Sequence, residues 1–496
     1  MNNFKLYLTN TLTGITELFK PSRHKQISCL EDNSKENNSS FQDKSKIKKI
    51  DLGFSVEDKK VTMYVCGITP YDYAHLGHGR CYVTFDVLYR LFNFMGYKVE
   101  YCRNFTDIDD KIIKKAEAEF QDPNKYPLIS SKFIDAYEED MKKLNCLSPT
   151  YEPRVTENIP AIISFIEILL NKNYAYSSDS GVYYDVQAFK DYGKLSKRNL
   201  NDLKAGARVE IREDKKSPLD FALWKKVSVQ EPGWDSPWGY GRPGWHIECS
   251  ALIEKYLKIP IDIHGGGMDL IFPHHENEIA QSEAAFCEPL AQYWIHNAFI
   301  LLDKEKMSKS LGNFFTLRDV FGKFDPVLLR YYFLNHHYRS PIEFSFDDIN
   351  MLIKSYQRLV RSFTGVESKD IRDIKDAYKS GIAQELLDAL LSDLNVSKFW
   401  GILFQNLKAL ELESNLDKNK QELIAIKSLI QNILGITLEP LIICDIKNNI
   451  EITPEIQSLI DQRDEARRSK DWAKSDSIRD QLKKLGFVIQ DKKRLD

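Results

Sequence analysis

The sequence predicts an α/β fold with a parallel sheet, interrupted by an insertion and followed by a helical region. Strand-like and helix-like segments alternate from residue 61 to residue 120, and the alternation resumes near residue 247. Because parallel strands need a crossover connection, usually a helix, this alternation indicates βαβ units. After about residue 320, apolar residues recur at helical spacing instead. With 496 residues, of which 43% are hydrophobic, the chain is long enough for several domains.

Two segments precede the first βαβ unit. Residues 4–20 have the pattern of a short strand or hairpin. Residues 22–58 are rich in serine, lysine and asparagine and contain few large apolar residues. Such a segment cannot bury enough apolar surface to offset its ordering entropy, so we predict a disordered insertion. A basic arm for RNA is the alternative.

The first βαβ unit begins with apolar residues that alternate with polar ones, which is typical of a strand. A turn containing glycine and proline follows, and the next helix ends before Gly96. The expected elements are a strand at 61–65, a turn at 67–70, a helix that reaches Phe94, a strand at 98–103 and a helix at 111–120.

The region 121–244 mixes helical and strand patterns, so we interpret it as a domain inserted into the α/β fold. Beyond it we expect a helix from Ile247, strands at 261–264 and 293–301, and helices at 346–365, 380–412, 420–434 and 454–485. The predicted domains are 1–120 with 245–320, the insertion 121–244, a helical domain 321–450 and a small basic tail 451–496.

Composition excludes several classes of protein. No apolar run reaches the roughly 18 residues of a transmembrane helix, and the N-terminus lacks the pattern of a signal peptide. We therefore expect a cytoplasmic protein with no membrane partner. The eight cysteines have no regular spacing and are expected to be reduced thiols, some available as metal ligands. The net charge of −3 gives no global reason to expect nucleic acid, so RNA would need a local basic patch.

The segment 64–80, YVCGITPYDYAHLGHGR, follows a predicted strand and runs into a helix. Ligands bind at the carboxyl ends of parallel strands, and helix N-termini favour phosphate. Gly77 allows close approach to the backbone, and His75 and His78 can donate to phosphate oxygens. The alternative is a tight turn with two surface histidines.

The segment 306–313, KMSKSLGN, places Lys306 and Lys309 three residues apart after an apolar strand. Two lysines flanked by serines suit a loop that neutralises a triphosphate. A solvated lysine loop is the alternative.

A third group of residues has the chemistry of a metal site. His274 and Glu278 are four residues apart and share a helix face. With one cysteine thiolate from each of two other segments, they would complete a zinc site of two sulfurs, one nitrogen and one oxygen. Spacing alone leaves the ligand set open, because His246, His264 and His275 are also eligible. Helix-capping polar residues with core cysteines are the alternative.

Two further patterns have competing interpretations. Asp107, Asp109 and Asp110 resemble a Mg²⁺ cluster, but we prefer a helix cap for one of them. Residues 462–494 carry eleven basic and six acidic residues, a balance of +5, with Trp472 and Phe487 among them. Such a segment suits single-stranded RNA bases, and a solvated amphipathic helix is the alternative.

Taken together, the motifs resemble those of cysteinyl-tRNA synthetases, a family of class I aminoacyl-tRNA synthetases. The matching stretches are those at 64–80 and 306–313, together with NFTDIDDKI at 104–112, PGWHIECSA at 243–251, IHGGGMDLIFPHHENEIAQ at 263–281 and DQRDEARRSKDWAKSDSIRDQL at 461–482. The insertion at 22–58 and the ending 491–496 depart from the family pattern.

The resemblance implies a Rossmann-like nucleotide-binding catalytic domain with an inserted connective domain, a C-terminal helical bundle and an anticodon-recognition tail. It places Zn²⁺ on Cys66, Cys249, His274 and Glu278, and the phosphates of ATP on His75, Gly77, His78, Lys306 and Lys309. It also places Thr106, Trp245 and Asp269 around the bound amino acid, with Mg²⁺ accompanying ATP.

The implied activity is ATP-dependent ligation of L-cysteine to tRNA(Cys) through cysteinyl-adenylate, by a monomer whose zinc takes the substrate sulfur. The insertion 121–244 is then expected to position the tRNA acceptor end. Two alternatives remain: the cysteine ligase of mycothiol synthesis, and a non-catalytic synthetase-like RNA-binding protein.

Overall fold

The computed structural model describes residues 4–21, 60–199, 214–302, 305–306, 314–368, 378, 381–412 and 417–441, and single positions between 458 and 482. The predicted insertion at 22–58, Lys309 and most of the helix predicted at 454–485 lie outside these residues. The chain divides into two compact units, one formed by 1–318 with 326–440 and the other by 319–325 with 441–496.

A four-stranded parallel sheet lies at the centre of the first unit, in the order β10–β9–β3–β4. Its strands are β3 (Lys60–Val65), β4 (Lys98–Cys102), β9 (Ile261–Gly267) and β10 (Ala291–Asn297). Five of the six residues of β3 are buried, as expected for a parallel strand covered on both faces. The predicted α/β class and parallel sheet are confirmed.

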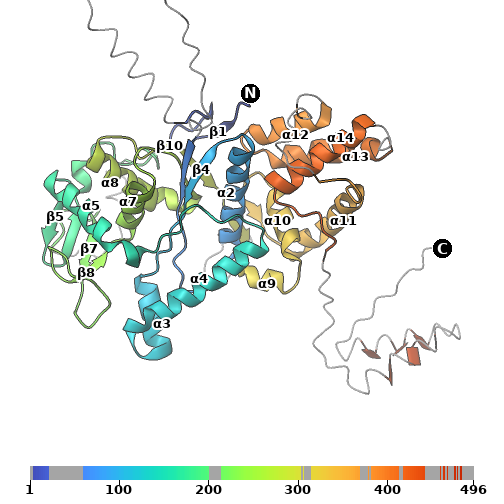
Figure 1. Cartoon of the computed structure of the whole chain (residues 1–496). Coiled ribbons are helices and arrows are strands. Elements are labelled where there is room, and N and C mark those ends of the chain that lie inside the picture. The colour runs from blue at the N-terminus through green and yellow to red at the C-terminus, as the bar shows by residue number, and fades with distance from the viewer. Residues whose placement is uncertain are drawn as a thin grey trace, which may run out of the picture. The chain divides into compact units, whose positions relative to one another are not determined.

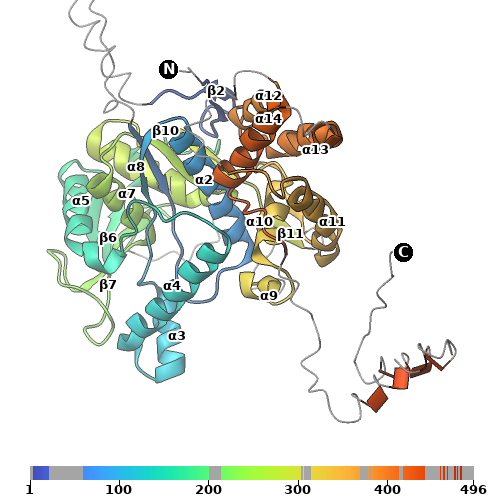
Figure 2. The same cartoon turned by 45° about the vertical axis from the view of Figure 1, so that its right-hand side comes forward.

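Two crossover connections of this sheet step toward opposite edges of it. Helix α2 (Leu76–Phe94) connects β3 to β4, whereas α8 (Glu276–Phe286) connects β9 to β10 on the other side of β3. Because such crossovers are right-handed, the two helices cover opposite faces, as Figures 1 and 2 show. The strand order therefore reverses between β3 and β9, and the carboxyl ends of these strands form the crevice where doubly wound sheets bind ligands.

The insertion folds as helices beside a small antiparallel sheet. Helix α3 (Asp110–Phe120) precedes the insertion, helices α4 (Tyr126–Lys143) and α5 (Ile159–Asn171) lie within it before the sheet, and α7 (Trp245–Tyr256) returns the chain to β9. The sheet has the order β5–β6–β7–β8, with strands Ala175–Ser178, Gly181–Tyr184, Phe221–Lys226 and Gly241–Pro243. Short helical turns lie at Pro123–Lys125, Val155–Asn158, Val186–Ala188, Met268–Leu270 and Ile271–His275.

The region after residue 314 is mostly helical, as predicted. The helices are α9 (Leu317–Phe321), α10 (Pro326–Leu334), α11 (Phe346–Ser362), α12 (Gly381–Leu391), α13 (Val396–Leu412) and α14 (Asp417–Ser428), the last continued by a π-helical turn at Leu429–Ile433. The single helix expected at 380–412 is wrong, because Asp393 and Leu394 adopt positive φ and turn the chain between α12 and α13.

The single strand expected at 293–301 is wrong too, because the structure has two strands there. β10 ends at Asn297, and β11 (Ile300–Leu302) belongs to a second sheet with β12 (Glu305–Lys306) and β13 (Ile342–Glu343). At the N-terminus the predicted hairpin is confirmed as β1 (Tyr7–Thr9) paired with β2 (Thr16–Leu18).

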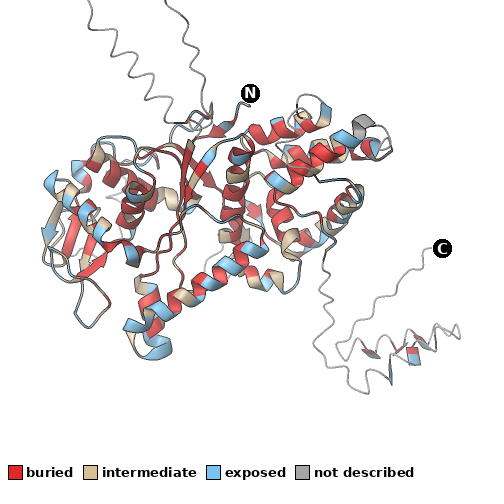
Figure 3. Cartoon of the chain, viewed as in Figure 1, coloured by how far each residue is buried: buried red, intermediate tan, exposed pale blue. Residues whose placement is uncertain are grey.

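The core is continuous from the parallel sheet into the insertion. Tyr64 of β3, Ile162 of α5, Val182 of β6 and Ile247 of α7 are buried in one apolar cluster. Figure 3 shows α2 buried over most of its length, whereas α3 has an exposed face. Among the helices described, none combines the length and apolar character needed to cross a bilayer.

Candidate active site and metal centre

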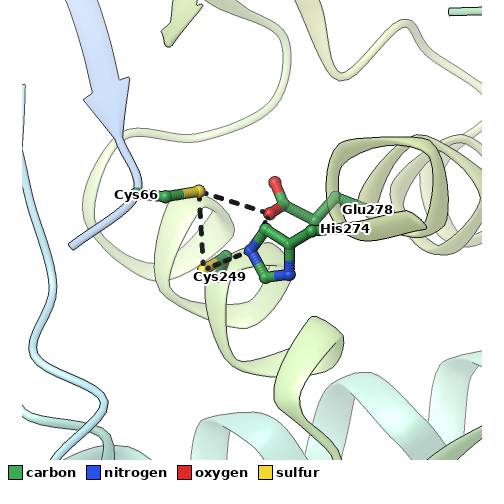
Figure 4. Close-up of side chains that lie close together, drawn as sticks. All are labelled: Cys66, Cys249, His274 and Glu278. Carbon is green, nitrogen blue, oxygen red and sulfur yellow. Dashed lines mark hydrogen bonds and ion pairs between the residues drawn. The ribbon is translucent and has the colours of Figure 1, made fainter. Parts of the chain in front are cut away.

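Four predicted ligand residues meet where the strand order reverses (Figure 4). Cys66 follows the end of β3, Cys249 lies on α7, His274 lies in the turn before α8, and Glu278 lies on α8 itself. The two Sγ atoms are 4.0 Å apart, and Cys66 Sγ lies 3.5 Å from Glu278 Oε1. Cys249 Sγ lies 3.5 Å from His274 Nε2. All four side chains are buried, so they form a closed polar cluster inside the core.

The spacing of these donor atoms fits a tetrahedral ion. With Zn–S near 2.3 Å and Zn–N near 2.0 Å, tetrahedral ligand atoms are separated by roughly 3.3–3.8 Å. The three distances from a cysteine Sγ to another donor atom, 3.5 to 4.0 Å, lie close to this range. His274 Nε2 and Glu278 Oε1 are closer, at 2.7 Å, because they form a direct ion pair. Two thiolates, an imidazole and a carboxylate are ligands that zinc accepts, so the residues present fit a metal site.

The charges inside the cluster favour two of the four residues in the form that binds a metal. A hydrogen bond from the Cys66 thiol lowers the pKa of Cys249 to about 6, against the opposing effect of burial. Burial raises the pKa of Glu278, but His264 and His274 together hold it well below its ordinary value. Burial lowers the pKa of His274, but the Glu278 carboxylate and the Cys249 sulfur outweigh it and raise the pKa to about 10. Cys249 and Glu278 are thus favoured as thiolate and carboxylate. Burial raises the pKa of Cys66, so Cys66 and His274 hold protons that they would release when a metal binds.

A second set of four residues also has metal-ligand geometry. Cys66 and Glu278 are shared with it, and His264 and His275 complete it. The two ring nitrogens of His275 lie 3.3 Å from Cys66 Sγ and 2.8 Å from His296 Nε2. The geometry of these residues therefore leaves both sets open, but the first set offers two sulfurs and the second only one. Because sulfur is a soft ligand that zinc prefers, the first set is the better zinc site.

The remaining predicted histidine, His246, is adjacent to the first set. Its Nδ1 lies 2.9 Å from His274 Nδ1, on the side of the ring that faces away from the cluster. A hydrogen bond at the second nitrogen fixes the tautomer and orientation of a ligating imidazole. His246 therefore orients the His274 ring from outside the first set.

The loop after β3 is held by the end of β4. Asn104 Oδ1 accepts from the Tyr64 hydroxyl at 2.9 Å and from the Gly67 amide at 3.0 Å. A Cβ atom on Gly67 would stand 1.5 Å from the Asn104 carbonyl oxygen, so only glycine fits there. Thr106 is buried nearby and donates to the buried Glu248 carboxylate at 3.0 Å.

Residues 75–78, with the sequence HLGH, form the N-terminus of α2. His75 is the N-cap residue, and its ring accepts from the His78 amide, while the His78 ring accepts from the His75 amide. The two rings stack with centroids 3.7 Å apart. A Cβ atom on Gly77 would lie 2.9 Å from the His75 ring, so glycine lets this ring lie against the helix. The histidines therefore cap the helix, and the same helix end is suited to bind phosphate.

The other predicted site residues lie on three further elements: Trp245 on α7, Asp269 in the turn after β9, and Lys306 in β12. Trp245 is 41% exposed at the start of α7, and its ring stacks on His274 at 4.2 Å. Asp269 is exposed in the turn after β9. The Lys306 backbone pairs with Leu301 in β12, whereas Lys309 lies outside the described residues.

The acidic triplet at 107–110 does not gather at one point. Asp107 accepts from the Thr156 amide at 3.0 Å, and Asp110 pairs with Lys225 and Arg242. Asp109 is the N-cap of α3 and accepts from the Lys111 amide at 2.8 Å. The preferred interpretation of a helix cap is confirmed.

Sequence reasoning missed the residues that hold α8 in place. The Glu276 carboxylate is buried and accepts from the amides of Gly193 and Ser196, at 2.9 and 2.8 Å. Asn277 is buried and accepts from the Tyr192 hydroxyl. Three consecutive polar residues at the start of a buried helix were the available signal, but the partners of Glu276 and Asn277 lie about 80 residues earlier in the chain.

Comparison with known proteins identifies the class. Residues 54–354 match the family described as tRNA synthetases class I (C) catalytic domain, and residues 450–494 match the cysteinyl-tRNA ligase anticodon binding domain. Among solved structures, Mycobacterium tuberculosis methionyl-tRNA synthetase in complex with methionyl-adenylate has a TM-score of 0.57 at 14% identity, over 77% of this chain and 92% of that one. The Agrobacterium radiobacter K84 LeuRS–tRNA–LeuAMS complex gives 0.55 at 11% identity, over 76% and 83%. The fold is that of a class I tRNA synthetase.

Sequence relatives identify the family. The cysteine–tRNA ligases of Bacillus pumilus and Coxiella burnetii are each 44% identical to this chain, and that of Geobacter sulfurreducens is 43% identical. In each case the match covers 88% of this chain and 94% of the relative. The chain belongs to the cysteine–tRNA ligase family.

Proposed function

We propose that this chain catalyses the ATP-dependent ligation of L-cysteine to tRNA(Cys). In the first step the cysteine carboxylate attacks the α-phosphate of ATP, giving cysteinyl-adenylate and releasing pyrophosphate. In the second, a hydroxyl of the terminal tRNA ribose attacks the activated carbonyl and AMP leaves. Family membership supports this activity, and one observation carries it: the buried two-sulfur cluster lies in the crevice of a doubly wound sheet.

We assign the metal to Cys66, Cys249, His274 and Glu278, and we propose zinc. When bound, zinc supplies a soft centre that favours the thiolate of cysteine over the hydroxyl of serine. One atom in an apolar pocket discriminates by only about 1–3 kcal/mol, so the metal-ligand chemistry is what makes selection efficient. The chain's own part is to hold the four donors in place: Asn104 fixes the loop of Cys66, and Glu276 fixes the helix of Glu278.

ATP is assigned to the start of α2 and to the lysine motif. Gly77 and the two histidines present the helix N-terminus to phosphate, and Lys306 and Lys309 neutralise the β- and γ-phosphates as charge develops. Mg²⁺ accompanies ATP. Trp245, Thr106 and Asp269 surround the amino acid, in keeping with the contact of Trp245 with His274 and the burial of Thr106.

The tRNA is assigned to two parts of the chain. The match at 450–494 to an anticodon binding domain, together with the +5 balance of 462–494, supports anticodon recognition by the tail. The insertion 121–244 is assigned to the acceptor end. This tail distinguishes the proposal from the cysteine ligase of mycothiol synthesis, which has no use for an anticodon domain. The proposed enzyme acts as a cytoplasmic monomer.

The decisive experiment is ATP–pyrophosphate exchange with each of the twenty amino acids, followed by transfer to tRNA. We expect exchange with cysteine alone and transfer to tRNA(Cys). Exchange with cysteine but transfer only to an amino sugar would favour the mycothiol enzyme. Absence of exchange from a folded, zinc-loaded sample would favour the non-catalytic RNA-binding protein.

A further inference from the structure

Arg80, the last residue of the motif that contains HLGH, is a buried arginine held by backbone carbonyls. Its side chain lies on the first turns of α2, and the residue is 1% exposed. Its Nη1 donates to the carbonyls of Ala298 and Phe299 at 2.9 and 2.8 Å. Its Nη2 donates to the carbonyls of His337, Tyr338 and Ser340. Each acceptor recorded for it in the described part of the chain is thus a main-chain oxygen, with no carboxylate among them.

Two of these carbonyls, those of Ala298 and Phe299, lie at the corner where the predicted strand 293–301 breaks in two. Ala298 and Phe299 separate β10 of the parallel sheet from β11 of the second sheet. The corner is closed by the Ala298 amide, which donates to Tyr338, and by the Ile342 amide, which donates to Phe299. From this corner β11 runs directly into the sequence that contains Lys306 and Lys309.

The chain returns from the lysine motif to the same helix end. The Leu76 amide donates to the Phe315 carbonyl at 3.1 Å, and the Leu317 amide donates to the Ala74 carbonyl at 2.8 Å. Gly79 allows this approach, because a Cβ there would meet the Leu317 side chain at 2.6 Å. Residues on both sides of the lysine motif are therefore fixed to the first turns of α2.

We propose that Arg80 is a positioning residue for adenylate formation, because it fixes the entry to the lysine motif against the helix end that carries His75 and His78. The proposal rests on the proposed function, which assigns both segments to the phosphates of ATP. Relative placement of the two segments then determines how well they stabilise the charge that develops on the phosphates.

Arginine is chemically suited to this position and lysine is not. A guanidinium presents five N–H donors in a rigid planar fork, whereas an ammonium presents three donors around one point. Arg80 uses the fork to join two chain segments, 298–299 with one nitrogen and 337–340 with the other. Burial lowers the pKa of Arg80 to about 10, so the group stays charged at neutral pH. Lysine keeps the charge but cannot reach both segments with the same geometry.

The test compares Arg80→Lys with Arg330→Lys in the full-length, zinc-loaded protein. Arg330 is the control, because it is also fully buried and also donates to main-chain carbonyls, those of Leu434, Leu144 and Asn145. Unlike Arg80, it also forms an ion pair with the Asp86 carboxylate. None of these recorded acceptors belongs to the segments 298–299 and 337–340 that Arg80 joins. For both variants one would titrate active sites by the burst of adenylate, and then measure exchange per active site, KM for cysteine and the melting curve.

We expect Arg80→Lys to lower the exchange rate per active site by about tenfold to a hundredfold. KM for cysteine should stay within about twofold, since the cysteine site is untouched. Arg330→Lys should lose melting temperature but keep its rate per active site. A normal per-site rate in Arg80→Lys would overturn the proposal, and so would an Arg80→Lys protein that cannot fold, because Arg80 would then be purely structural. Wild-type protein without cysteine-dependent exchange would instead refute the proposed function.

Discussion

Replacement of Cys249 by serine tests the metal centre most directly. The change keeps the side chain nearly isosteric but exchanges a soft sulfur ligand for a hydroxyl that retains its proton. Cys102, which is buried at the end of β4, provides the matched control, because Cys102→Ser is the same substitution outside the cluster. Any difference between the two variants is therefore due to the lost ligand.

The magnitude follows from the four-ligand set. Burying a hydroxyl without a full set of partners costs about 1–3 kcal/mol in either variant. Structural zinc sites bind with apparent free energies of about 10–16 kcal/mol, or about 2.5–4 kcal/mol for each of four ligands. Loss of one ligand should then weaken zinc binding by about 10²–10³-fold. Both variants should lose stability from the buried hydroxyl, and Cys249→Ser alone should also lose this zinc affinity.

The assay measures zinc per chain after dialysis against a weak chelator, together with cysteine-dependent pyrophosphate exchange. We expect Cys102→Ser to keep one zinc and near-normal exchange, and Cys249→Ser to lose both. Retention of zinc and exchange by Cys249→Ser would refute the assignment and favour the set of Cys66, His264, His275 and Glu278.

Three further predictions concern ATP, tRNA and pH. Lys309→Ala should lower kcat for exchange by about 10²–10³-fold with little change in KM for cysteine, because the lysine acts on charge that grows in the transition state; a raised KM at normal kcat would contradict this. Truncation after Pro454 should leave pyrophosphate exchange intact and sharply reduce aminoacylation, whereas full transfer to tRNA would place anticodon recognition elsewhere. Asp140 is buried beside Arg318, and burial raises its pKa to about 6 despite that partner. Its protonated form is favoured in the folded state, so the stabilisation is complete below about pH 4 and lost as pH rises through about 6. Thermal melts of wild type and Asp140→Asn from pH 4 to 8 should diverge, the wild type losing up to about 3 kcal/mol relative to the variant; parallel curves would show that Asp140 ionises normally.

The sequence alone determined the local elements and the chemical groups. Alternating apolar residues gave the strand 61–65, and the stop at Gly96 set the end of α2, because these features depend only on neighbours in the chain. The i, i+4 spacing of His274 and Glu278 likewise predicted their contact, now seen at 2.7 Å. Spacing could not select the cysteine partners.

Tertiary structure alone decided which distant groups meet. Cys66 and Cys249 are 183 residues apart, and they meet because β3 ends and α7 begins at the crevice between β3 and β9. The break between β10 and β11 at Ala298 could not be predicted from neighbouring residues either. The Ala298 carbonyl accepts a hydrogen bond from Arg80, which lies 218 residues earlier in the chain. The same is true of the turn at Asp393, whose carboxylate accepts from the Thr9 amide. Periodicity encodes the direction in which side chains point along one segment. Corners and ligand sets depend on hydrogen bonds between segments, and these exist only once the sheet order has brought the segments together.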